Sequence, residues 1–281
     1  MADTSPVEFD HCRELALIPG SVFEFTSRYV STGKLNPLLA LYALRQAVST
    51  IPQSPVDDTV KWTKLKWWSE EIMAEPDASS RHPVLRALWL SGARVQLDNS
   101  LLLRLIGDAL SEVDATPDAD EKSLFERLGA LGATEILLEL ALDNAEVDSQ
   151  SLEFLGAATG SFRLISSLSA NRLSGVVRLP LSLLAKYKVS SEQLEQESHV
   201  TELSQIIEEL AENALDWYSK GLISLSTDRK VPAFTHLQLR LAMENRRLKI
   251  IRQDALGFLE AGKFFGPADA WFAWRFLRKL R

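Results

Sequence analysis

The residue types that most often build metal or catalytic sites are widely spaced in this chain. The histidines His11, His82, His199 and His236 show no His-x-x-x-His or His-Glu-x-x-His spacing, so no zinc site is predicted. Cys12 is the single cysteine and cannot form an internal disulfide; we expect it to lie in an exposed N-terminal segment. The stretches GALGA and GAATGS follow no predicted strand, which excludes a phosphate-binding glycine loop. No catalytic residue is predicted from these patterns.

The C-terminal segment PADAWFAWRFLRKLR combines aromatic and basic residues at helical spacing. A helix over about 267–281 would bring Trp271, Trp274, Arg275 and Arg278 close to one another, and these are candidate membrane contacts. The alternative is a terminal helix that docks its aromatic side chains into the core and leaves its basic residues in water. Residues 240–281 hold ten Lys/Arg and four Asp/Glu, although the whole chain carries a net charge of −7. A basic end on an acidic body fits a membrane surface or an acidic partner.

Composition places the chain among ordinary globular proteins. Its 281 residues are 46% hydrophobic and 25% charged, which excludes disordered and collagen-like chains. An excess of acids over bases argues against nucleic-acid binding, which requires dense Lys/Arg. The N-terminus has neither an apolar signal segment nor an Arg-rich transit peptide, and no stretch is apolar enough to span a membrane. We therefore expect a cytoplasmic protein, with a peripheral position at the inner membrane as an option.

Helical periodicity runs through nearly the whole sequence. Leu41, Leu44, Val48 and Ile51 form one stripe of a helix that we expect Pro37 to start. Without sustained strand alternation, the sequence predicts an all-α single domain over residues 1–281. The predicted helices cover about 36–51, 56–75, 82–95, 99–113, 119–145, 148–171, 181–197, 201–226, 235–262 and 267–281.

The helix predicted over 56–75 begins at two acids and carries three tryptophans. Asp57 and Asp58 lie where the helix dipole favours negative charge. Trp62, Trp67 and Trp68 are expected to pack into the core, in line with the stripe formed by Val60, Leu65, Trp68 and Ile72.

Three segments, in order, resemble the squalene/phytoene synthase family. They are LALYALRQAV, then WTKLKWWSEEI followed by RHPVLRAL, and finally VVRLPLSLLAKYKVSSEQL. The resemblance implies an isoprenoid-synthase-type helical bundle around a central cavity. In active members, two Asp-rich motifs face each other across this cavity and bind Mg²⁺, which holds the substrate diphosphate.

This chain lacks acids in both windows where the resemblance places those motifs. The first window reads Ser49-Thr50-Ile51, and no Asp or Glu occurs between Glu24 and Asp57. The second window lies in GSFRLISSLSANRLSGVVRLP, and no acid occurs from Phe154 to Ser191. Hydroxyl groups are poor ligands for Mg²⁺ in place of carboxylates. We therefore predict no metal site and no cofactor.

The same windows keep arginines that can pair with an anion. Arg28 lies ahead of the first window, and the candidates for anion or ligand binding in the cavity are Arg45, Arg163, Arg172 and Arg178.

The resemblance extends to a non-catalytic branch of the family, the respiratory complex I assembly factor with a squalene/phytoene-synthase-like domain. The leading hypothesis is a non-enzymatic binding or assembly protein, whose partner would be a respiratory-complex subunit. One alternative is a prenyltransferase with relocated carboxylates such as Asp57, Asp58 and Glu135; another is an isoprenoid- or lipid-binding protein.

Overall fold

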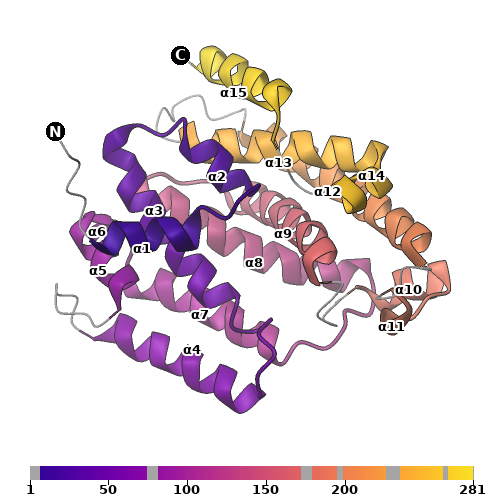
Figure 1. Cartoon of the computed structure of the whole chain (residues 1–281), viewed down its shortest axis with the longest axis horizontal. Helices are drawn as coiled ribbons and strands as arrows, with labels where there is room; N and C mark the ends of the chain where they lie inside the picture. The colour runs from indigo at the N-terminus through magenta and orange to yellow at the C-terminus, as the bar shows by residue number, and fades with distance from the viewer. Residues whose placement is uncertain are drawn as a thin grey trace.

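The chain forms a bundle of α-helices, drawn in Figure 1. The computed structural model describes residues 7–74, 82–171, 179–194, 199–225, 235–261 and 265–280, and these residues contain no β-strand. The predicted all-α isoprenoid-synthase-type fold is confirmed. The helices are α1 (Val7–Ala16), α2 (Val22–Ser27), α3 (Thr32–Ser49), α4 (Asp58–Met73), α5 (Pro83–Leu90), α6 (Ala93–Gln96), α7 (Asn99–Val113), α8 (Glu121–Leu142), α9 (Ser149–Asn171), α10 (Leu181–Tyr187), α11 (Ser191–Leu194), α12 (Val200–Leu225), α13 (Thr235–Gln253), α14 (Ala255–Ala261) and α15 (Pro267–Leu280).

Short polar residues fix where several helices begin. The Asp57 carboxylate accepts the backbone N–H of Thr59 at 2.8 Å and caps α4. Asp120 and Ser123 form a reciprocal capping box at the start of α8. Pro83 occupies the first turn of α5, as its lack of an N–H group favours.

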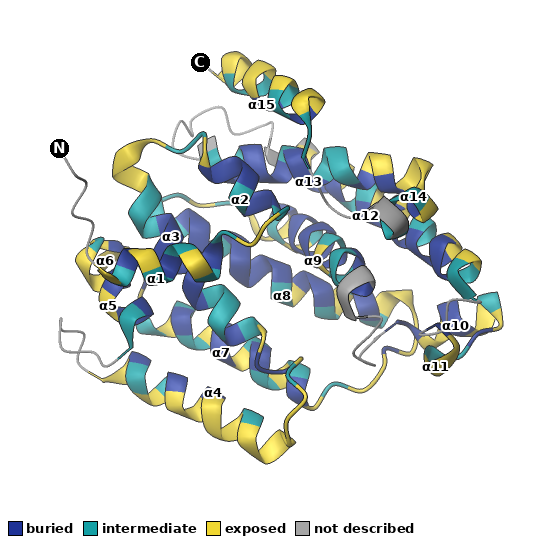
Figure 2. Ribbon diagram, in the orientation of Figure 1, coloured by how far each residue is buried: buried dark blue, intermediate teal, exposed yellow. Residues whose placement is uncertain are grey.

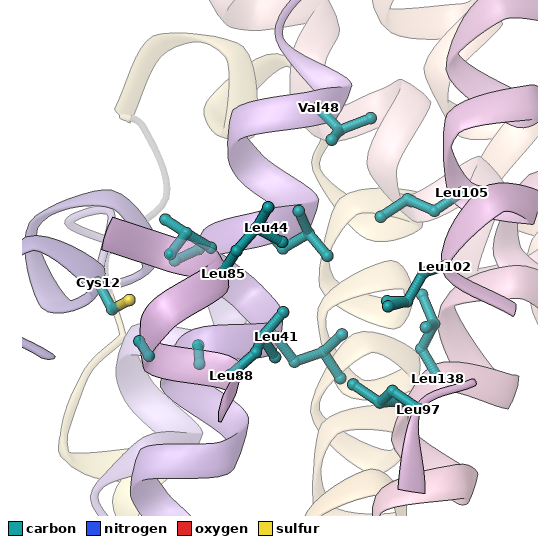
Figure 3. Packing of buried hydrophobic residues seen from close by; sticks show 14 of the residues in the cluster. Cys12, Leu41, Leu44, Val48, Leu85, Leu88, Leu97, Leu102, Leu105 and Leu138 are labelled. Atoms are coloured by element: carbon teal, nitrogen blue, oxygen red, sulfur yellow. The ribbon is translucent and has the colours of Figure 1, made fainter. Parts of the chain in front are cut away.

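One hydrophobic core joins the helices of the N-terminal half. Leu41, Leu44 and Val48 of α3 are fully buried, and Figure 3 shows them between α5 and α7. Leu85 and Leu88 approach from α5, and the labelled leucines of α7 close the other side. The predicted apolar stripe of α3 is therefore the centre of this core.

A second core joins α8, α9, α10, α12 and α13. Tyr218 of α12 is its largest fully buried side chain. In Figure 2, α8 and α9 are mostly buried, whereas α4 turns an exposed face to solvent. The two cores meet at α8, since Leu138 belongs to the first and Ile136 to the second.

Close backbone contact sets the spacing of α8 and α9. A Cβ added to Gly132 would lie 2.0 Å from the carbonyl oxygen of Gly156, and one added to Gly160 would lie 2.6 Å from that of Leu128. Only glycine permits these approaches. The two central helices are therefore locked at a short separation.

Several predicted helix boundaries differ from the structure. α3 starts at Thr32, so Pro37 lies inside the helix rather than at its start. The predicted 235–262 helix is divided at Asp254, whose carboxylate accepts the N–H of Gly257. The predicted 181–197 helix ends at Tyr187, because Lys188 adopts a left-handed conformation with φ of 54°. The predicted 82–95 helix is divided into α5 and α6, because Gly92 adopts a left-handed conformation with φ of 75°. α1 and α2 were not predicted.

The expected burial was wrong for four residues. Cys12 is completely buried in the N-terminal core, because α1 packs against α3 and α5. Trp62 and Trp67 are 42% and 37% exposed, and Val60 is exposed too, since α4 contacts the bundle through one narrow face. Trp68 lies on that face and is buried as predicted. None of the described helices combines the length and hydrophobicity that crossing a bilayer requires.

Candidate functional site

A cavity of about 500 Å³ lies between the two cores. Its wall is formed by residues from the α1–α2 connection and from α2, α3, α7, α8, α9, α13 and α14. One part of the wall is apolar, and the other part carries five arginines and three glutamates: Arg45, Arg127, Arg163, Arg240, Arg247, Glu112, Glu135 and Glu244.

The two windows expected to hold metal ligands meet at this cavity. Ser49 lines it from α3, and Ser166 and Ser167 line it from α9. The two stretches in which metal ligands were expected therefore line the same cavity, and each contributes hydroxyl groups to its wall.

Glu135 of α8 is the first of three acids bound by arginine. Its side chain is buried, and each of its oxygens accepts a hydrogen bond from a different guanidinium, Oε2 from Arg45 and Oε1 from Arg163. The carboxylate therefore ties α3, α8 and α9 together at the cavity wall.

Glu139 lies one turn further along α8 and is buried as well. Its Oε1 accepts the Tyr42 hydroxyl at 2.6 Å and lies 2.8 Å from Nε of Arg240, while Oε2 lies 3.0 Å from Nδ1 of His236. Burial alone would raise the pKa of Glu139, but Arg240, His236 and Arg45 outweigh it and lower the pKa to about 2. Glu139 is a fixed negative charge in the core.

Glu244 of α13 closes the network. Its Oε1 accepts a hydrogen bond from Arg240 Nη1 at 2.8 Å, and its Oε2 accepts those of the Tyr218 hydroxyl at 2.6 Å and the Thr159 hydroxyl at 3.1 Å. Burial, with the neighbouring Glu244, raises the pKa of Tyr218 well above its ordinary value. The tyrosine is therefore a permanent donor.

Two further acids, Glu112 and Asp108, reach the cavity region from α7. Glu112 accepts a hydrogen bond from Arg127 at 2.9 Å, and Asp118 holds the same arginine from its other side at 2.7 Å. Asp108, one turn before Glu112, lines a small adjoining pocket together with Ser49 and Ser167. Burial raises the pKa of Asp108 to about 6, against a side-chain hydrogen bond with Thr134 that lowers it, and its Oδ2 has no hydrogen-bond partner among the described residues. Sequence reasoning had not selected Asp108.

The residues present do not fit the magnesium clusters that the resemblance implies. Mg²⁺ requires several oxygen ligands in near-octahedral geometry, usually carboxylates together with water. Glu112, Glu135 and Glu244 already pair with guanidinium groups, and one remaining acid, Asp108, cannot supply two clusters. Within the described part of the chain, no group of three or more His, Cys, Asp or Glu side chains is arranged to hold a metal ion.

The predicted site residues separate into three groups. Arg45 and Arg163 line the cavity, where both donate hydrogen bonds to Glu135. Arg172 and Arg178 lie outside the described residues. Arg28 is exposed and pairs with Glu24 on its own helix.

Asp57 and Asp58, considered as relocated metal ligands, are exposed at the start of α4. Asp57 caps the helix, and Asp58 pairs with Lys61 at 2.8 Å. Neither residue lines the cavity. Both interact with the first turn of α4 instead.

Glu139, His236, Arg240 and Glu244 were missed by sequence reasoning. One signal was available: Glu135 and Glu139 interrupt the apolar run of α8 with a spacing of four residues, which places both on a buried face. Their partners come from helices far away in sequence, and no local pattern reveals them.

α15 packs beside α13 at the edge of the bundle (Figure 1). Phe272 and Leu277 pack against a small cluster that includes the buried Ala273. Trp271 and Trp274, in contrast, are 58% and 51% exposed, so the docking alternative is wrong for them. The Arg275 guanidinium carbon lies 5.3 Å from the Trp271 ring centroid, and that of Arg278 lies 4.8 Å from the Trp274 centroid.

Comparison with known proteins agrees with this geometry. A family model described as squalene/phytoene synthase matches residues 20–254. The crystal structure of squalene synthase HpnC from Alicyclobacillus acidocaldarius superposes with a TM-score of 0.68 at 17% identity, covering 89% of this chain and 96% of that one. The crystal structure of a dehydrosqualene synthase in complex with ligand gives a TM-score of 0.71 at 14% identity, covering 98% and 95%. No curated protein sequence matches the chain.

Proposed function

We propose, because the chain belongs to the squalene/phytoene synthase family, that it is a non-catalytic member of that family which acts by binding. The observation that carries the proposal is the cavity wall. Ser49, Ser166 and Ser167 line it where metal ligands are expected. Glu135, in the same wall, already accepts hydrogen bonds from Arg45 and Arg163. Ionising an allylic diphosphate requires cations that neutralise the leaving group. Glu112, Glu135 and Glu244 are already neutralised by arginines and are therefore poor ligands for those cations.

A helper in the assembly of a respiratory complex is the specific role that we propose. Supporting it, α4 presents Trp62 and Trp67 to solvent among the lysines of VKWTKLKWW, the segment through which the chain resembles the assembly-factor branch. Tryptophan, with tyrosine and arginine, is enriched among the residues that contribute most to protein–protein binding energy. The face of α4 is the candidate contact with a respiratory-complex subunit.

A condensation assay tests the absence of catalysis. The purified chain is incubated with farnesyl or geranylgeranyl diphosphate and Mg²⁺, and an active dehydrosqualene synthase serves as the positive control. We expect no squalene, dehydrosqualene or phytoene. Electron paramagnetic resonance of Mn²⁺ gives a readout independent of turnover, and we expect no ion bound tightly with the diphosphate. Formation of a condensed product would refute the proposal.

Prenyl transfer with relocated acids is the second candidate. Asp108 favours it, since this carboxylate lies in the pocket that also holds Ser49 and Ser167. If condensation occurs, this candidate requires Asp108→Asn to abolish it while Asp57→Asn leaves the rate unchanged. A rate that survives Asp108→Asn would remove the candidate.

We also propose that the protein binds peripherally to an anionic membrane through α15. Trp271 and Trp274 are exposed, and Arg275 and Arg278 lie against their rings. Tryptophan prefers the bilayer interface, and each basic residue near an anionic surface adds about 1 kcal/mol of attraction. This arrangement supports a position at the membrane surface for a protein of the cytoplasm.

A further inference from the structure

A second cavity, of about 350 Å³, lies beneath α15 and is enclosed by α2, α3, α8, α13 and α15. Among the residues that the structure describes, it shares no lining residue with the cavity between the two cores. Phe23 and Tyr42 line that first cavity and stack with their ring centroids 3.6 Å apart. His236 lines the second cavity and meets both rings edge-on, at 5.6 and 6.0 Å. This aromatic cluster separates the two cavities.

The charged groups in the wall of the second cavity are already paired. Lys34 of α3 forms an ion pair with Asp143 at the end of α8. Glu139 lies 3.0 Å from Nδ1 of His236 and 2.8 Å from Nε of Arg240. A charged ligand group would have to break one of these pairs, and separating an enclosed ion pair is costly. The wall therefore favours an uncharged ligand group.

The remainder of this wall is largely aliphatic. Side chains from five parts of the chain contribute to it, among them Val30, Leu38, Leu142, Leu237, Leu277 and Leu280. Leu38 and Leu237 are buried, at 6% and 5% exposed. An aliphatic chain that enters from water gains free energy with each methylene group that it buries against such a wall.

α15 forms the outer wall of the second cavity. Leu277 and Leu280 line the cavity, whereas Trp271 and Trp274 on the same helix are exposed. Leu280 is itself 44% exposed, and Lys34, which also lines the cavity, is exposed too. The cavity therefore reaches the surface beside the last turn of α15. A helix that lies on a bilayer sinks to the boundary between headgroups and acyl chains, so this opening would lie close to lipid chains.

We propose that the cavity beneath α15 takes up one acyl chain of a membrane lipid. The chain enters beside Leu280 and lies against the leucines of α3, α8 and α13, while the lipid headgroup stays outside. The proposal rests on the peripheral membrane position proposed above and names the lipid group that the protein would hold there.

Photo-crosslinking of the full chain on phosphatidylglycerol vesicles tests the proposal. The probe is phosphatidylcholine with a diazirine at the end of one acyl chain, mixed into the vesicles, and mass spectrometry locates the cross-links. We expect cross-links at Leu142 and Leu237 in addition to those on α15. Leu237 is buried, so a lipid that touches only the protein surface does not reach it.

Leu142→Trp fills part of the cavity, and Leu103→Trp is the matched control. Both leucines are half-buried in helices, but Leu103 of α7 lines neither this cavity nor the one between the two cores. Excluding two methylene groups from an apolar site weakens binding at least about tenfold, so we expect a loss of that size in the cross-linking of Leu237 by Leu142→Trp. Leu103→Trp should change it less than about twofold, and sedimentation with vesicles should be unchanged in both.

The cross-link map of the wild-type chain decides the matter even if Leu142→Trp does not fold. Cross-links confined to α15 on a chain that sediments with the vesicles would overturn the proposal and leave the peripheral membrane position intact. A chain that does not sediment would end the membrane position and this proposal with it. Equal labelling of Leu237 by a free diazirine fatty acid without vesicles would overturn the bilayer as the source of the chain.

Discussion

Replacing Gly132 with alanine should separate the two central helices. The added Cβ would lie 2.0 Å from the carbonyl oxygen of Gly156 and 2.7 Å from its carbonyl carbon. Real Cβ atoms essentially never approach another atom closer than 3.0 Å, and here both neighbours are backbone atoms that no rotamer change can move. The helices must therefore shift by on the order of 1 Å in a close-packed interior.

The cost follows from that displacement. Overpacking a core costs about 1–3 kcal/mol, and a rigid backbone clash belongs at the upper end. Alanine recovers about 1 kcal/mol through its higher helix propensity. We expect the free energy of unfolding of Gly132→Ala to fall by about 2 kcal/mol relative to wild type.

Gly107→Ala is the matched control, because it makes the same chemical change within α7. No atom lies within 4 Å of a Cβ added at Gly107, which is exposed. We expect this variant to gain up to about 1 kcal/mol.

Urea denaturation followed by circular dichroism measures both variants. If Gly132→Ala were as stable as Gly107→Ala, the two helices would not be in backbone contact and the description of the cavity wall they form would be wrong.

Three further predictions concern a thiol, an acid and the terminal helix. Burial, with a smaller effect of a nearby carboxylate, raises the pKa of Cys12 to about 12, so Ellman's reagent at pH 8 should label it only after unfolding; rapid labelling of the native chain would contradict its burial. The folded-state pKa of Glu139, about 2, lies below its ordinary 4.5, so its stabilising effect is complete above pH 4.5 and is lost as the pH falls towards 2. In urea titrations, Glu139→Gln should therefore be less stable at neutral pH and lose less stability on acidification, and an unchanged acid dependence would count against this role. Replacing Trp271 and Trp274 together with serine should reduce sedimentation with phosphatidylglycerol vesicles at least fivefold, whereas Trp89→Ser on α5 should not, and equal binding of all three proteins would remove α15 as the membrane contact.

The sequence predicted those features that depend on local periodicity. Leu41, Leu44, Val48 and Ile51 are all buried, because an amphipathic stripe determines which face of a helix turns inward. The all-α class and the missing acids at both windows were also readable, since each concerns residues that are neighbours in the chain.

Contacts between residues that are far apart in the sequence could not be predicted from local periodicity. Arg240 and His236 reach Glu139 across 97 or more residues, and nothing near them in sequence marks either as buried. The exposed position expected for Cys12 is wrong for the same reason, because α1 is covered by α3 and α5. Conversely, Trp62 and Trp67 are apolar by type but lie on the outer face of α4.

The guanidinium of Arg45 pairs with two acids on successive turns of α8, Glu135 and Glu139. Losing this one side chain would leave Glu135 with Arg163 and Glu139 with Arg240 and His236, but it would remove a cation that the two enclosed acids share. We therefore expect substitutions at position 45 to be accompanied by changes at 135 or 139. Among relatives with this fold, positions 45, 135 and 139 should covary. Relatives that lack this combination of residues should have a cavity with a different function.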